Sequence, residues 1–122
     1  MDIAIDFDGT IVKHEFPVVG EKLPKAIYWM QKFQEAGARL LLNTMRSERY
    51  LDDAVEYCRD NGVEFFGVNR NPEQDSWTSS PKVYAQLYID DASFGCPLVY
   101  EPGSRPYVDW DIVGPAVLDM II

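Results

Sequence analysis

Four short apolar runs, each followed by polar residues, stand out along the chain. They occupy residues 1–6, 39–44, 63–68 and 87–91. Runs this short and this apolar are typical of buried strands in a parallel sheet. We therefore predict four buried strands, with a short fifth strand at 97–100.

Helical spacing appears between these runs and again at the end of the chain. Apolar residues recur every three to four positions from residue 23 to a stop at Gly37, and again over 48–60. The spacing continues over 109–122, where Gly114-Pro115 interrupts it. We predict three helices, and Pro115 either begins the last one or kinks a longer one.

The order of these elements predicts the fold. Strands that alternate with helices favour an α/β fold with a doubly wound, Rossmann-like parallel sheet. A chain of 122 residues, 47% hydrophobic and 25% charged, fits a single domain over 1–122, with the polar stretch 69–81 as a loop. In such sheets the functional site lies at the carboxyl ends of the strands.

The net charge and the cysteines limit the classes of binding partner and the cellular compartment that we expect. A net charge of −9 at pH 7 argues against nucleic acid or an anionic membrane as a partner. A phosphorylated substrate stays compatible, because a divalent cation can reverse the potential inside a cleft. Cys58 and Cys96 fit no zinc spacing, and Cys58 is predicted to lie in the core. Because no signal-like or membrane-length apolar segment is present, we expect a reduced, cytoplasmic setting.

Two pairs of carboxylates follow predicted strands. Asp6 and Asp8 leave the first strand just before a Gly-Thr turn, and Asp90 and Asp91 end the fourth strand. A single aspartate at a strand end is most often a turn former. Carboxylates this close repel each other unless a cation or a shared proton intervenes, and Mg²⁺ prefers oxygen ligands. Two such pairs at one edge of a sheet favour a magnesium site.

These residues, in this order, resemble the four motifs of the haloacid dehalogenase superfamily. The segment Asp6-Phe-Asp-Gly-Thr10 is similar to the first motif, the apolar run to Thr44 to the second, Lys82 to the third and Ile89-Asp-Asp91 to the fourth. The intervals between them leave no room for the cap domain that many members carry. The resemblance therefore implies a capless, phosphatase-like hydrolase with a Rossmann-like core and an open site.

The resemblance also implies a division of roles. Asp6 would attack phosphorus and form an aspartyl-phosphate, while Asp8 would protonate the leaving oxygen and later activate water. Thr44 would donate its hydroxyl to a phosphoryl oxygen, and Lys82 would pair with Asp6 and phosphate. The implied Mg²⁺ ligands are Asp6, the backbone carbonyl of Asp8, and Asp90, with Asp91 in support.

Substrate contacts are predicted around the first two motifs. Arg46, two positions after Thr44, could bind phosphate through its guanidinium group or be an exposed arginine at a helix start. Gly9 and Thr10, in the turn after the first strand, are also assigned to substrate binding. His14, the only histidine, is expected in a loop near the mouth of the site and not as the general base.

The expected function is magnesium-dependent hydrolysis of a phosphate monoester. The alternative is a non-catalytic phosphate- or metal-binding regulatory module of the same fold. Phosphoryl transfer to a sugar is disfavoured because it usually needs a cap. Capless members include phosphatases of macromolecules and oligomeric phosphatases of sugar phosphates, so a small or macromolecular phosphorylated substrate and a homo-oligomer both stay open.

Overall fold

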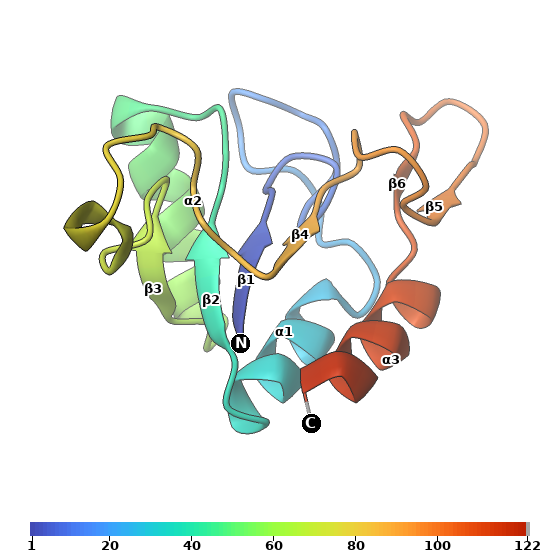
Figure 1. The fold of residues 1–122 in the computed structure, drawn as a ribbon. Helices are drawn as coiled ribbons and strands as arrows, with labels where there is room; N and C mark the ends of the chain where they lie inside the picture. Colours follow the sequence, from blue (N-terminus) through green and yellow to red (C-terminus); the bar gives the residue numbers. More distant parts are fainter. Residues whose placement is uncertain (122) are drawn as a thin grey trace.

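The computed structural model describes residues 1–121 and contains a four-stranded parallel sheet (Figure 1). Its strands are β1 (Asp2–Ile5), β2 (Arg39–Leu42), β3 (Phe65–Val68) and β4 (Leu87–Ile89), in the spatial order β3-β2-β1-β4. The registers of β1 with both neighbours are parallel, as predicted. Because β1 is central, the residue after it lies between the carboxyl ends of β2 and β4.

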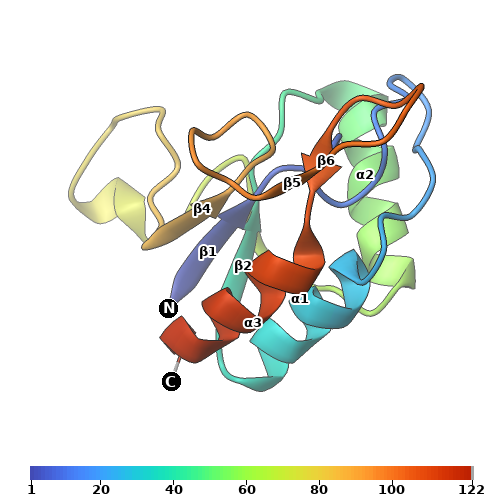
Figure 2. The same cartoon turned by 90° about the vertical axis from the view of Figure 1, so that its right-hand side faces the viewer.

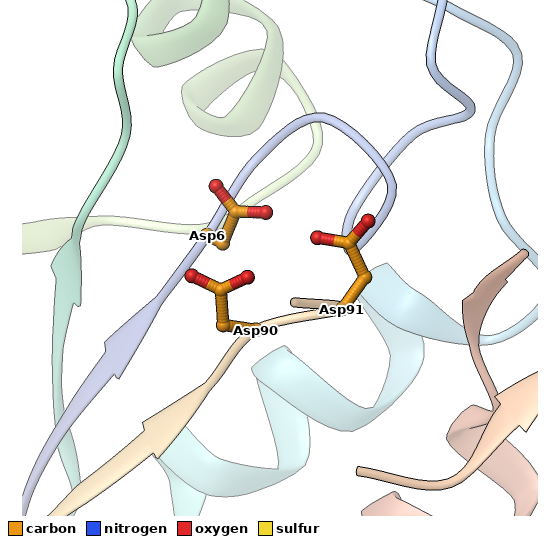
Figure 3. Close-up of side chains that lie close together, drawn as sticks. All are labelled: Asp6, Asp90 and Asp91. Carbon is orange, nitrogen blue, oxygen red and sulfur yellow. The ribbon is translucent and has the colours of Figure 1, made fainter. Parts of the chain in front are cut away.

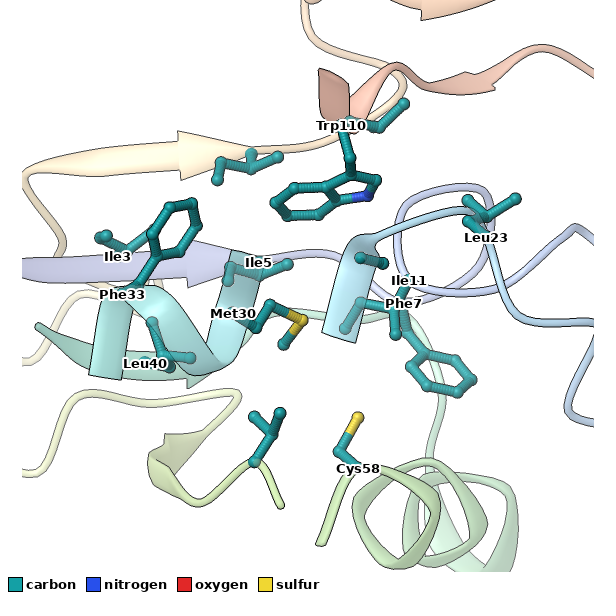
Figure 4. Close-up of a cluster of buried hydrophobic side chains, with 14 of the residues drawn as sticks. Ile3, Ile5, Phe7, Ile11, Leu23, Met30, Phe33, Leu40, Cys58 and Trp110 are labelled. Carbon is teal, nitrogen blue, oxygen red and sulfur yellow. The ribbon is translucent and has the colours of Figure 1, made fainter. Parts of the chain in front are cut away.

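All three helices cover the same face of this sheet (Figure 2). They are α1 (Ala26–Glu35), α2 (Glu48–Asp60) and α3 (Trp110–Ile121). Alternate residues of β1 and β2 point towards them and form one apolar core, because successive side chains of a strand face opposite sides. Figure 4 shows this core, whose central side chains include Ile3, Ile5, Phe7, Met30, Phe33, Leu40, Cys58 and Trp110.

The opposite face of the sheet is covered by an irregular segment, residues 69–86, with one 3-10 turn (Gln74–Ser76). Here the doubly wound prediction is wrong in one respect, because no helix forms this second layer. Two buried polar side chains hold the segment in place. Asn71 donates to the Tyr84 carbonyl at 3.1 Å, and Gln74 donates to the Lys82 carbonyl at 2.9 Å. These bonds satisfy backbone groups that a helix would have satisfied internally.

The end of the chain differs from the simplest expectation. A strand forms within 97–100, but this strand, β5 (Leu98–Val99), pairs antiparallel with β6 (Tyr107–Val108) and stays outside the main sheet. Helix α3 runs through Pro115, which agrees with the longer of the two predicted helices. Gly114 packs directly on the indole ring of Trp29, and a Cβ there would collide with it, so the glycine allows α1 and α3 to approach closely.

Two predictions from the sequence concern the burial of Cys58 and the absence of a membrane-length helix. Cys58 is fully buried, as predicted, and burial raises the pKa of its thiol to about 12. Both thiols are free. Within residues 1–121, no helix has the length and apolar character needed to cross a membrane.

Candidate active site

Three carboxylates meet at the carboxyl ends of β1 and β4 (Figure 3). Asp6 directly follows β1, and its backbone N–H donates to the Ile89 carbonyl at 3.0 Å. This bond continues the pairing of the two strands and places Asp6 beside Asp90 and Asp91. One carboxylate oxygen from each of the three aspartates lies within 4.8 Å of the others. The structure thus brings together three of the predicted metal ligands.

The three carboxylates strongly perturb one another. Burial, followed by the charges of Asp90 and Asp91, raises the pKa of Asp6 to about 8. Burial also raises the pKa of Asp90, and Asp91 adds to the rise. Ionising all three therefore requires a compensating positive charge. A divalent cation with oxygen ligands meets this requirement.

Asp91 is restrained by two residues of the loop after β1. His14 Nε2 lies 2.7 Å from Asp91 Oδ2, and the Asp91 backbone N–H donates to Thr10 Oγ1 at 3.2 Å. The Thr10 hydroxyl in turn donates to Asp6 Oδ2 at 3.0 Å. Burial opposes ionisation of Asp91, yet the hydrogen bonds with His14 and Asp6 hold its pKa below the usual value. His14 is a loop residue beside the site, as predicted.

Asp8 points to a different partner. Arg46 Nε and one terminal nitrogen donate to its two carboxylate oxygens, each at 2.8 Å. The remaining N–H groups of Arg46 donate to the backbone carbonyls of Pro17, Val18 and Tyr50. Arg46 is only 3% exposed. The prediction of an exposed arginine is wrong, because Arg46 is buried and its donors are engaged within the protein, whereas a phosphate contact from Arg46 stays a prediction.

The turn after β1 is buried. Gly9 is buried with φ of 84°, a left-handed conformation that favours glycine. Thr10 is also fully buried, and its hydroxyl is engaged by Asp6 and Asp91. Both residues are therefore engaged within the protein, and their substrate contacts stay predictions. A metal contact from the Asp8 backbone carbonyl stays a prediction.

A cavity of about 420 Å³, lined by both polar and apolar side chains, adjoins the carboxylate cluster at Asp90. Lys82 lines it, with its ammonium group 5.6 Å from the centre of the Tyr88 ring. Thr44 lies just beyond β2, at the same edge of the sheet, and its hydroxyl accepts a hydrogen bond from the Arg46 backbone at 3.2 Å. Among residues 1–121, no ion pair or hydrogen bond joins Lys82 or Thr44 to Asp6. The other lining residues are Asn43, Pro81, Val83, Tyr88 and Ser93.

Sequence reasoning missed three contacts at this site. The His14–Asp91 and Arg46–Asp8 pairs join positions 77 and 38 residues apart, and nothing in the local sequence marks either pair. The Thr10 bridge between Asp6 and Asp91 has a weak signal, since a threonine after a strand-ending aspartate can bind neighbouring polar groups. Asn43 and Ser93, which line the cavity, also went unassigned.

Fold and site together define an α/β protein with a parallel sheet and an acidic, candidate metal-binding edge. No family model matches the chain, and no curated protein matches it. A solved structure of a conserved protein from Bacteroides thetaiotaomicron matches with 37% sequence identity and a TM-score of 0.79. The match covers 98% of this chain and 91% of that one. The chain therefore belongs to the same family as that conserved protein.

Proposed function

We propose that the chain is a magnesium-dependent phosphate monoester hydrolase, as its resemblance to the haloacid dehalogenase superfamily implies. The observation that carries this proposal is the convergence of Asp6, Asp90 and Asp91 at the carboxyl edge of a parallel sheet. Ligands of open α/β sheets bind at this edge, where the strand order reverses. Here the reversal falls beside β1, the strand that leads into Asp6.

The donor set of the cluster fits a magnesium ion. It consists of carboxylate oxygens alone, and oxygen ligands suit Mg²⁺, whereas thiolates or imidazoles suit softer metals. Asp6 and Asp90 would hold the ion, with Asp91 and the backbone carbonyl of Asp8 in support. When bound, Mg²⁺ would offset the charge of the nucleophile and of the phosphoryl group together.

Asp6 is the proposed nucleophile. One of its carboxylate oxygens attacks phosphorus as the bond from phosphorus to the leaving oxygen breaks, which gives an aspartyl-phosphate and the alcohol. Water then attacks the phosphorus, the bond to Asp6 breaks and inorganic phosphate leaves. Dividing the displacement in this way replaces one difficult step by two easier ones. Thr10 orients the nucleophile through its 3.0 Å hydrogen bond.

Asp8 is the proposed acid and base. It would give a proton to the leaving oxygen in the first step and take one from water in the second. Both of its oxygens accept hydrogen bonds from Arg46, so the Asp8 side chain must rotate away from Arg46 to reach the substrate. Backbone carbonyls from the loop around Pro17 hold the guanidinium in place meanwhile.

The cavity beside Asp90 is the proposed phosphoryl subsite. Lys82 lines it as a cation on a flexible stem and can turn from Tyr88 towards a bound phosphate. Thr44 supplies a hydroxyl from the neighbouring strand end. Only a loop and α1 separate β1 from β2, and only a loop and α2 separate β2 from β3, so neither interval holds a cap-sized insertion. The leaving group would then project into solvent.

Phosphate release tests the proposal. Wild type and Asp6→Asn are assayed on para-nitrophenyl phosphate and a panel of small phosphoesters, with Mg²⁺ or with EDTA. We expect release by the wild type that requires Mg²⁺ and is lost in Asp6→Asn, which keeps a side chain of the same shape. An Asp6→Asn variant that hydrolyses at the wild-type rate would contradict the assignment of the nucleophile.

A non-catalytic phosphate- or metal-binding module is the second candidate. The observation that favours it is the full engagement of Asp8 by Arg46, which leaves the proposed acid occupied. This candidate predicts magnesium-dependent phosphate binding, measured by calorimetry, with no turnover on any panel member. Catalytic release of phosphate from one member rules it out.

A further inference from the structure

We propose that His14 is a positioning residue of the metal centre, which fixes the orientation of the Asp91 carboxylate for ion binding. The inference rests on the proposed Mg²⁺ site and adds a residue that the carboxylate motifs do not contain. Its central observation is the 2.7 Å contact between His14 Nε2 and Asp91 Oδ2. Residues that hold a metal ligand by a hydrogen bond commonly tune the affinity of the metal.

The pair is enclosed and closely packed. The side chain of His14 is 19% exposed and that of Asp91 is 14% exposed. Both side chains rest directly on Gly9, where a Cβ would collide with the imidazole and the carboxylate. Because Gly9 has no Cβ, the imidazole and the carboxylate have room to meet. Such packing limits the rotamers that Asp91 can adopt.

Asp91 is also restrained at its backbone. Its N–H donates to Thr10 Oγ1, so the main chain and the carboxylate are held separately by two residues of one loop. Because His14 binds Oδ2, it also fixes the direction in which the other oxygen, Oδ1, points. The contact with His14 therefore sets the orientation in which the Asp91 carboxylate meets the other two aspartates.

The support behind His14 does not depend on the metal. The adjacent Lys13 N–H donates to the Glu21 carbonyl at 2.9 Å, and Val12 forms a β-bridge with Lys22. These backbone contacts close the loop at its base. His14 is therefore held in place before an ion arrives, which is what a positioning residue requires.

His14 itself is placed outside the ion's ligands. The three aspartates form a compact set of oxygens, and His14 does not belong to that set among residues 1–121. Among the described residues, the hydrogen bond to Asp91 is the one that joins His14 to the cluster. The imidazole consequently acts on the ion through the carboxylate.

Metal affinity measured by calorimetry tests this role. Mg²⁺ and Mn²⁺ are titrated into wild type, His14→Ala, His14→Gln and Lys13→Ala. We expect His14→Ala to weaken binding by about tenfold or more, and His14→Gln, whose amide N–H can replace the hydrogen bond, to stay within about threefold of wild type. Lys13→Ala is the matched control, because it removes ion pairs to Glu21 and Glu101 from the same loop without touching Asp91. It should bind as wild type does.

Three results would overturn the inference. The first is wild-type affinity in His14→Ala, and the second is an equal loss in Lys13→Ala, which would assign the effect to the loop. The third is a directly coordinated nitrogen in the electron spin-echo spectrum of the Mn²⁺ form, which would make His14 a ligand. In all three, wild type still binds metal, so the proposed function survives. A wild type that binds neither ion would overturn the metal centre and His14's role together.

Discussion

The two ends of β1 carry the same side chain in opposite electrostatic surroundings. Asp2, at the start of the strand, is 5% exposed and accepts hydrogen bonds from Arg39 at 2.8 and 3.1 Å and from Asn71 at 2.9 Å. Asp6, directly after the strand, faces Asp90 and Asp91 instead. Burial opposes ionisation of Asp2, yet Arg39 and Asn71 hold its pKa below the usual value, whereas the pKa of Asp6 rises to about 8.

The contrast separates a carboxylate that the chain compensates with its own cation from carboxylates that repel one another. A buried charge that the chain compensates with its own cation contributes to the fold. A cluster of like charges without such a cation costs stability, and this cost is typical of functional sites. Asp8 shows that a compensated carboxylate also occurs at the same edge as the cluster, because Arg46 binds it only two residues after Asp6.

The largest expected effect comes from removing the compensation of Asp8. Arg46→Ala leaves a carboxylate without its cation and three backbone carbonyls without their donor, so we expect a loss of about 3–5 kcal/mol in the free energy of unfolding. Urea denaturation measures this loss. Arg49→Ala, an exposed arginine in the first turn of α2, is the control and should change stability by less than about 0.5 kcal/mol. Equal losses in the two variants would show that Asp8 does not need Arg46.

Relieving the repulsion at Asp6 should raise the free energy of unfolding. The folded state holds a proton on Asp6 up to a pKa of about 8, while the unfolded chain loses it near 3.8. The folded state therefore binds more protons between these values, and the stability of the metal-free protein falls as pH rises through this window. In EDTA, the stability advantage of Asp6→Asn over wild type should grow by about 4 kcal/mol between pH 5 and pH 8.5, because about three pH units of the window lie between them. Thermal unfolding at the two pH values checks this. Lower stability of the variant at pH 8.5 would mean that Asp6 is not repelled.

Removing the compensated carboxylate at the other end should have the smallest effect. Asp2→Ala takes an acceptor from Arg39 and Asn71, but Arg39 keeps its ion pair with the exposed Glu73. We expect a loss of about 1–2 kcal/mol at pH 7, with no change in metal binding. Because the pKa of Asp2 is lowered in the folded state, its contribution is lost only as pH falls below about 4. A changed Mg²⁺ affinity in Asp2→Ala would contradict the view that only the carboxyl end of β1 takes part in metal binding.

The sequence predicted the parallel sheet and the three helices because both depend on local patterns. The range predicted for α2, 48–60, agrees with the structure to the residue, since its apolar spacing and the stop after it are both local signals. The cover over the other sheet face could not be predicted, because it depends on Asn71 and Gln74 binding distant backbone carbonyls. At the site, the two carboxylate pairs could be predicted because each follows a predicted strand. The partners of Asp8 and Asp91 could not be predicted, because they come from distant positions in the sequence.

Mg²⁺ binding with proton release tests the central claim most directly. Calorimetric titrations at pH 7 in two buffers of different ionisation enthalpy report the affinity and the number of protons released. Because Asp6 is largely protonated at pH 7 in the metal-free protein, wild type should bind Mg²⁺ and release close to one proton per ion. Asp2→Asn should behave as wild type does, and Asp6→Asn should lose both signals. Absence of binding in wild type, or binding and proton release that survive in Asp6→Asn, would contradict the account.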